Sequence, residues 1–525
     1  MFTTAIFAAG WANADDLPPK PNVIVFLADD MGLGDTSAYQ DWTGNPDEFQ
    51  VETPAMERLA ARGVRFTDAH SPSSLCSPTR YTLLTGRYCW RSRLKYHVLY
   101  GVQCDPILER ERVTLPEFLQ RNGYRTGMVG KWHLGVKYRT SEGKPAEGWD
   151  DADLTQPLYD CPLDHGFDYF VGFTRSHPTS GPDGDKRNTP QQRIGPGWIE
   201  GRRVVGATGN GKQLDGSYRL HEIGAALHRY AMRFLESAAA DDRPFFLYFA
   251  SPANHLPHTP SEKVGGVQVV GASRFKNGEP TNSARYDFIY QNDVHVAHLL
   301  RFLEETPDPR RPGHRLIENT VFVFSSDNGA ERNDKHATGP LRSNKGSLYE
   351  GGHRIPLIVS WPAGGIGDGR DDTPGKTCTR LAALTDLYAT IVDILGKPLP
   401  PVSGKEFGAE DSVSQLAAMR GEPCPPRIPL FPNNHKEAAR KLSPELAWVA
   451  VRSNAAPLPG QWKLLLDHRF AYGEGVYPKE LYNLADDPME QHNLIDRPEY
   501  KPVVDFLTAK AKQAIGDDGS SRNLE

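Results

Sequence analysis

The amino-acid sequence predicts an α/β protein whose large, mostly parallel sheet is sandwiched by helices, followed by a smaller α+β domain with an antiparallel sheet. Continuous apolar runs, rich in β-branched or aromatic residues, occupy residues 22–28, 245–250, 320–326 and 355–360. Such runs are typical of parallel strands that are buried on both faces. Amphipathic helical patterns at residues 219–240 and 286–303 lie among these runs. This alternation of buried strands and helices favours a sheet with helices on both sides.

The pattern changes after about residue 396. Residues 397–432 are rich in Pro, Gly and charge, and we expect a linker there. Short strand-like runs follow at residues 446–452, 462–466 and 480–484, without crossover helices between them. A helical pattern at residues 502–515 closes this part. We therefore predict a main domain over residues 21–396, a small C-terminal domain over 433–515 and a disordered tail over 516–525.

The composition narrows the class of protein. Of 525 residues, 38% are hydrophobic and 24% are charged, which excludes wholesale disorder. The net charge of −6 and the lack of a long basic run argue against nucleic-acid binding. No window approaches 18 consecutive apolar residues, so we expect no membrane span.

The first 14 residues form a separate feature. They are apolar and end in Ala12-Asn13-Ala14, a small-x-small pattern that a signal peptidase accepts, although no Lys or Arg precedes them. We expect residues 1–14 to be the remnant of a signal peptide, and the protein to be exported to the periplasm or the extracellular space. In such a compartment some of the six cysteines could pair, for example Cys378 with Cys424, but the sequence does not give the connectivity.

Acidic and amide side chains follow two of the predicted strands directly. Asp29 and Asp30 come after the first strand, and Asp327 and Asn328 come after the strand at 320–326. In an open parallel sheet, ligands bind beyond the carboxyl ends of the strands. If the two strands are neighbours, these oxygen atoms suit a hard cation such as Ca²⁺ or Mg²⁺, whereas the alternative is that each pair caps a helix or turn.

The most specific motif surrounds Cys76. Cys76-Ser77-Pro78-Thr79-Arg80 is followed by Leu83-Leu84-Thr85-Gly86, and a second motif, GYRTGMVGKWH, spans residues 123–133. Together with the acidic pairs, the Lys345 segment KGSLYEGG and the C-terminal ELYNLADDP, they resemble the type I, formylglycine-dependent sulfatases from about residue 21 to residue 494. The resemblance implies an alkaline-phosphatase-like fold, catalysis by the domain at 21–396, and oxidation of Cys76 to formylglycine by a formylglycine-generating or anaerobic maturation enzyme.

The resemblance also implies a set of site residues. One Ca²⁺, or less favourably Mg²⁺, would be held by Asp29, Asp30, residue 76, Asp327 and Asn328. The catalytic residues would be Cys76, Arg80, Lys131, His133, His258 and Lys345. Formylglycine hydrate has two hydroxyl groups, one to attack sulfur and one whose deprotonation re-forms the carbonyl and releases sulfate. Within this scheme His133 takes that proton, His258 protonates the leaving oxygen, and Lys345 binds the sulfate.

Three further residues are candidates for substrate contact, namely Ser176, His177 and His255; for each, loop structure is the alternative. Lys131 and His133 alternate along an extended segment, so we expect both to face one side. We favour a sulfated carbohydrate as the substrate over a small aryl ester, by analogy alone. The other hypotheses are a phosphatase or phosphonate monoester hydrolase on the same fold, and a carbohydrate-binding or scaffold protein without catalysis.

Overall fold

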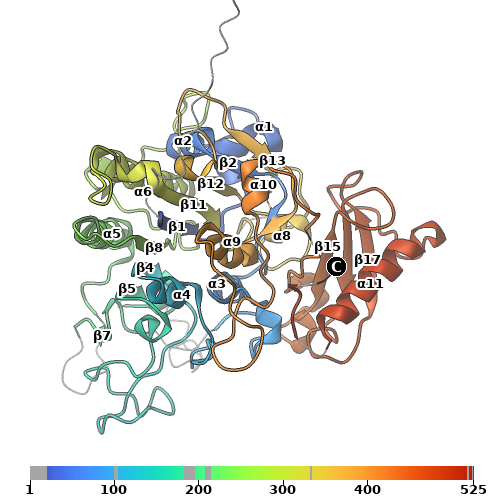
Figure 1. Ribbon diagram of the computed structural model, residues 1–525, viewed down its shortest axis with the longest axis horizontal. Helices are drawn as coiled ribbons and strands as arrows, with labels where there is room; N and C mark the ends of the chain where they lie inside the picture. Colours follow the sequence, from blue (N-terminus) through green and yellow to red (C-terminus); the bar gives the residue numbers. More distant parts are fainter. Residues whose placement is uncertain are drawn as a thin grey trace, which may run out of the picture.

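The computed structural model describes residues 20–99, 105–181, 195–206, 215–331, 334–427, 429–516, 519–522 and 524. The expected signal segment at 1–14 lies outside these residues. Among them, one ten-stranded sheet forms the centre of the molecule (Figure 1). In spatial order its strands are β13 (Lys376–Cys378), β2 (Val64–Phe66), β12 (Leu357–Ser360), β11 (Thr320–Ser326), β1 (Asn22–Ala28), β8 (Phe245–Ala250), β4 (Arg125–Lys131), β5 (Tyr169–Phe173), β6 (Ile199–Glu200) and β7 (Arg203–Val204).

Alternate residues of the central strands enter two different cores. In β1, Val23, Val25 and Leu27 face one core, and Ile24 and Phe26 face the other. All five side chains are fully buried, as expected for a strand covered on both sides. The first core is closed by α3 (Cys76–Thr85), α4 (Leu115–Arg121), α9 (Leu387–Ile394) and α10 (Leu416–Arg420), and the second by α2 (Pro54–Arg62), α5 (Ile223–Ala239) and α6 (Ala284–Glu305).

Smaller elements complete the main domain. These are α1 (Gln40–Thr43), α7 (Lys335–Thr338), α8 (Glu350–His353) and the short strands β3 (Ala69–His70), β14 (Ala382–Ala383), β9 (Lys263–Val264) and β10 (Val267–Gln268). In the described part of the chain, none of the helices is both long and apolar enough to span a bilayer.

A three-stranded antiparallel sheet and one long helix form the C-terminal part, drawn in red in Figure 1. The elements are β15 (Val449–Ser453), β16 (Trp462–Leu466), β17 (Pro478–Asn483) and α11 (Lys501–Ala514). One face of this sheet packs on α11 through Leu464 and Leu507. The other face packs on Leu348 and Tyr349, just before α8, so the small sheet lies directly against the main domain.

The structure confirms the predicted fold and corrects several details. The strand expected at 355–360 is shortened to β12 and runs antiparallel to β11 and β2, because the chain returns without a long crossover helix. The expected linker at 397–432 contains the short helix α10 and packs against the main domain, where Arg112 pairs with Glu410 at 2.6 Å and Arg91 with Asp411 at 2.9 Å.

The C-terminal tail also differs from the expected disorder where it is described. Ser521 donates through its hydroxyl to Asp411 at 2.7 Å, and its side chain is buried. The physical reason is that the packed segment around Asp411 offers buried acceptors, which the tail satisfies.

Candidate active site

The acidic pairs meet at one edge of the central sheet. β1 and β11 are parallel neighbours with Ala28 opposite Ser326, so Asp29-Asp30 and Asp327-Asn328 leave adjacent strands side by side. Ligand atoms of Asp29, Asp30, Asp327 and Cys76 all lie within 4.8 Å of one another, and all four residues are buried. We refer to these four residues with Asn328 as the acidic centre.

Helix α3 brings Cys76 and Arg80 to this centre. Cys76 is the first residue of the helix, and its Sγ lies 3.7 Å from Asp29 Oδ1. Arg80 follows one turn later, as an i, i+4 neighbour on the same face. Its Nε and Nη2 donate to Asp327 Oδ2 at 3.1 and 2.8 Å, and its Nη1 donates to the Lys131 carbonyl at 3.0 Å. A single buried guanidinium therefore fixes the positions of β4 and of the loop after β11.

Two lysines, together with Arg80, offset the negative charge of the carboxylates in the acidic centre. Lys131 Nζ lies 2.5 Å from Asp29 Oδ2, and Lys345 Nζ lies 2.6 Å from Asp30 Oδ2. Burial would raise the pKa of Asp29, but nearby charges, that of Lys131 foremost, hold it well below its usual value. Burial, only partly offset by Lys345, raises the pKa of Asp30 to about 8. With all three acidic groups ionised, three carboxylates face three cations. A bound dication would favour the ionised form of Asp30 and give the site a net positive charge suited to an anion.

The acidic centre fits a hard divalent cation. Asn328 Nδ2 donates to Asp30 Oδ1 at 2.7 Å and to the Gly329 carbonyl at 2.9 Å. Its Oδ1 is buried and has no hydrogen-bond partner. A buried acceptor without a donor is costly, and coordination of a cation would satisfy it. Carboxylate and amide oxygens are the ligands that Ca²⁺ and Mg²⁺ prefer.

His133 reaches the same region, but not along a continuing strand. β4 ends at Lys131, and His133 has a φ of 57°, so the predicted extended segment through both residues is wrong. His133 Nε2 lies 3.1 Å from the Leu99 carbonyl, which can only accept, so Nε2 carries the proton. The Nδ1 atom is then a free lone pair, buried without a partner. Burial, with the charges of Lys131 and Arg80, lowers the pKa of His133 well below its usual value, which keeps this base neutral.

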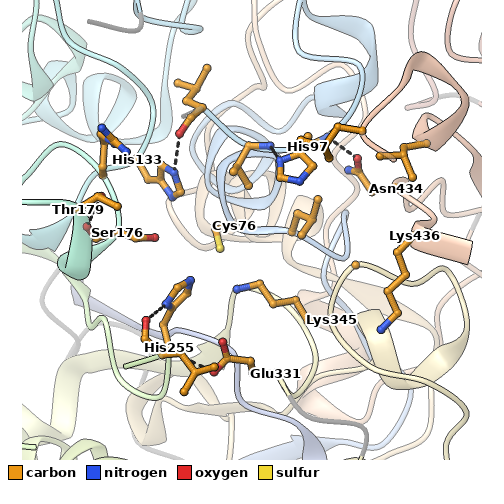
Figure 2. A pocket seen from close by; sticks show the side chains of 18 of the residues that line it. Cys76, His97, His133, Ser176, Thr179, His255, Glu331, Lys345, Asn434 and Lys436 are labelled. Carbon is orange, nitrogen blue, oxygen red and sulfur yellow. Dashed lines mark hydrogen bonds between the residues drawn. The ribbon is translucent and has the colours of Figure 1, made fainter. Parts of the chain in front are cut away.

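A pocket of about 1010 Å³ opens above Cys76 (Figure 2). Cys76, His133, His255 and Lys345 all line it. The remaining lining residues come from five stretches of the chain, 97–99, 175–179 (except His177), 256–257, 434–436 and 439–442, and from five single positions, Leu75, Leu220, Glu331, Gly346 and Leu446. The acidic centre therefore lies at the base of a cavity much larger than one sulfate group.

The histidines after β8 differ from expectation. His255 lines the pocket, and its Nδ1 lies 2.6 Å from the Leu256 carbonyl, which leaves Nε2 for a ligand. His258 is not among the lining residues, and its Nε2 lies 3.7 Å from Glu331 Oε2. The structure therefore favours His255, where the sequence had suggested His258, as the histidine that can contact a leaving group.

Of the two candidate residues in the loop after β5, only one lines the pocket. Ser176 lines the pocket, as expected for a substrate contact. His177 is fully buried behind the wall, and its Nε2 lies 3.1 Å from the Pro257 carbonyl. Its expected contact with substrate is therefore corrected to a structural one, in which it supports the loop that carries His255.

Sequence reasoning missed the far wall of the pocket. His97, Glu331, Asn434 and Lys436 line it, together with residues 439–442. His97, Asn434 and Lys436 neither follow a predicted strand nor belong to a motif, so no local pattern indicates them. Glu331 comes shortly after the predicted strand at 320–326, and its strand-end position was a signal that could have indicated it. Residues 434–442 lie at the start of the predicted C-terminal domain, yet they help to form this pocket.

Comparison with known proteins adds independent findings. Residues 21–397 match the family model described as Sulfatase. A curated N-acetylgalactosamine-6-O-sulfatase of Bacteroides thetaiotaomicron is 28% identical, over 90% of this chain and 89% of the relative. Human arylsulfatase A is 30% identical, over 93% of this chain and 85% of the relative.

Solved structures agree on the fold. One, described in connection with the metabolism of multiple glycosaminoglycans by Bacteroides thetaiotaomicron, superposes with a TM-score of 0.70 at 25% identity and covers 95% of this chain and 100% of its own. A phosphonate monoester hydrolase of Agrobacterium radiobacter superposes with a TM-score of 0.56 at 19% identity, over 94% of this chain and 95% of its own, which shows a shared fold only.

Proposed function

Since the chain belongs to the sulfatase family, is a sulfatase enzyme and has an alkaline-phosphatase-like fold, we propose that it removes sulfate from a sulfated carbohydrate through a formylglycine at position 76 and a divalent cation. The observation that carries this proposal is the place of Cys76. It begins α3 within the acidic centre and also lines the large pocket. One side chain thus touches both the candidate metal site and the space for a substrate.

Formylglycine at position 76 would supply, as its hydrate, a hydroxyl that bonds to sulfur while the bond from sulfur to the alcohol oxygen breaks, and a second hydroxyl whose loss of a proton re-forms the carbonyl and frees sulfate. His133 is the base for that proton, since its Nδ1 lone pair has no hydrogen-bond partner and the residue lines the pocket. His255, in place of the expected His258, is the candidate to protonate the departing alcohol oxygen. Because the Leu256 carbonyl holds the Nδ1 proton, this step requires the imidazolium form, with a second proton on Nε2.

The cations around residue 76 hold the anionic substrate. Lys345 extends toward Cys76 in Figure 2 and is the group best placed to bind the sulfate and the bridging oxygen. Lys131 and Arg80 orient residue 76 from beneath and offset the carboxylates. Asp29, Asp30, Asp327 and Asn328 would hold the cation, Ca²⁺ in preference to Mg²⁺, which would polarise a sulfate oxygen.

Three parts of the proposal extend beyond the site itself. A carbohydrate substrate is supported by the size of the pocket and by a relative named for N-acetylgalactosamine-6-O-sulfate. Export is supported by the apolar segment at 1–14. Maturation by a formylglycine-generating or anaerobic enzyme is required by the proposed chemistry, because the unmodified residue is a thiol.

The test combines mass and activity. The peptide that contains residue 76 should be about 18 Da lighter than its cysteine form in active protein. Cys76→Ala should abolish sulfate release, whereas Cys161→Ala, at a buried cysteine that does not line the pocket, should retain it. A fully active Cys76→Ala protein would refute the mechanism. Faster turnover of an aryl phosphate than of the matched aryl sulfate would instead support a phosphatase.

A further inference from the structure

The wall of the pocket opposite His133 comes from the chain after residue 433, and it is built firmly into the site. The Lys436 amide donates to the Gly346 carbonyl at 2.6 Å, next to Lys345. The Ser74 hydroxyl donates to the Asn434 carbonyl at 2.9 Å, two residues before Cys76. Asn434 Oδ1 in turn accepts from the His97 amide at 2.7 Å. These hydrogen bonds fix the backbone of Lys436 relative to both Cys76 and Lys345.

This wall carries an excess of positive charge. Lys436, Arg440 and Lys441 line the pocket and are exposed. Within the described part of the chain, no carboxylate lies within 4.0 Å of any of these three cationic groups. The Lys436 ammonium donates to Asn344 Oδ1, a neutral acceptor. Glu331 is the one carboxylate among the described lining residues, and it accepts from the Leu256 amide at 3.0 Å.

These three cationic groups lie away from the expected position of the scissile sulfate at residue 76. In Figure 2, Lys345 points toward Cys76, and Lys436 lies on the far side of Lys345. A single sulfate ester at residue 76 would occupy only the base of a cavity of about 1010 Å³. Cavities of that size enclose ligands larger than one sugar. Unpaired cations in a concave wall attract a negative group more strongly than they would on a convex surface.

We propose that Lys436, with Arg440 and Lys441, forms a subsite for a second anionic group of the substrate. The preferred substrate is then a saccharide in which the sulfated sugar is joined to a residue that bears a carboxylate or another sulfate. This inference rests on the proposed function and specifies its substrate class. Lys436 is the principal residue, because its backbone is anchored to Gly346 and, among the described residues, no carboxylate lies within 4.0 Å of its ammonium group; the adjacent Glu437 acts on it only at longer range.

The test compares matched disaccharides. The first carries one sulfate ester and a neighbouring uronic acid, and the second is the same compound with the carboxyl group reduced to an alcohol. The wild-type enzyme should show about tenfold higher kcat/KM for the acidic compound, mainly through KM, as one charge-assisted contact gives. A third compound with a second sulfate in place of the carboxylate distinguishes the two anions.

Substitutions of single lysines test whether Lys436 causes the preference for the acidic compound. Lys436→Gln should bring the ratio of the two kcat/KM values close to one, and Lys436→Arg should restore much of it. Lys397→Gln, at an exposed lysine outside the pocket, should leave the ratio unchanged. Equal kcat/KM of the wild type for the acidic and reduced compounds would overturn the inference, as would an unchanged ratio in Lys436→Gln. Failure of the wild type to release sulfate from any of the three disaccharides would instead count against the proposed function.

Discussion

Arg452 ties the small C-terminal sheet to the main domain, and its replacement by Met should destabilise the protein strongly. Arg452 lies in β15 and is fully buried. Its Nη2 is 2.9 Å from Asp68 Oδ1, and its Nε is 3.5 Å from Glu350 Oε1. Met keeps much of the volume but leaves both buried carboxylates without this cation. Removing one partner of a buried pair costs about 3–5 kcal/mol, so we expect a loss of that size in the free energy of unfolding.

The assay is urea denaturation followed by tryptophan fluorescence, with recovery of the signal on dilution as the check on reversibility. Arg469→Met is the matched control in the same part of the chain. Its ion pair with Asp467, at 2.6 Å, is one-third exposed on the arginine side, and we expect a much smaller loss in the free energy of unfolding. The double variant Asp68→Asn/Arg452→Met should lose less than the two single changes added together. Equal losses for Arg452→Met and Arg469→Met would refute this reasoning.

Three other predictions concern catalysis, the cation and pH. His133→Gln removes the free Nδ1 base while keeping a donor for the Leu99 carbonyl, so kcat should fall by about 10²–10⁴ without a change in melting temperature; a kcat within threefold of wild type would contradict the role of His133. Chelation of divalent cations should abolish sulfate release and lower the melting temperature, because three buried carboxylates would lose their shared ligand; Ca²⁺ should restore both, and an unaffected melting temperature would count against a metal at the acidic centre. Burial lowers the pKa of His228 from 6.5 to about 4, so the unfolded chain binds a proton there between these pH values and the folded protein does not; stability should therefore fall as the pH drops through that window. His228→Gln should weaken this pH dependence of the melting temperature, and an identical dependence in the variant would exclude His228 as a contributor.

The sequence predicts best those features that depend on local patterns. β1, β8 and β11 have the predicted bounds because each is an uninterrupted apolar run that both cores bury. The meeting of Asp29 with Asp327 follows from two parallel strands ending at the same edge, which strand-end positions already suggest. Cys76 and Arg80 were found because their spacing is part of a motif on one helix.

Features that depend on distant contacts could not be predicted. The antiparallel direction of β12 is set by the path of the chain between residues 327 and 356, and apolar composition does not encode direction. The choice between His255 and His258 depends on how one loop turns, since both follow the same strand. The pairing of Ser74 with Asn434 joins residues 360 positions apart, and neither has a pattern that indicates its partner.

The anchoring of Asn434 and Lys436 beside Ser74 and Gly346 has a consequence for biosynthesis. The ribosome must translate most of the chain before one side of the cavity exists. A product truncated ahead of residue 433 by a premature stop codon would keep the acidic centre but leave Ser74 and Gly346 without these partners. Such a fragment would lack the enclosure that selects a substrate, and it would also lack Arg452, the buried cation that pairs with Asp68 of the main domain.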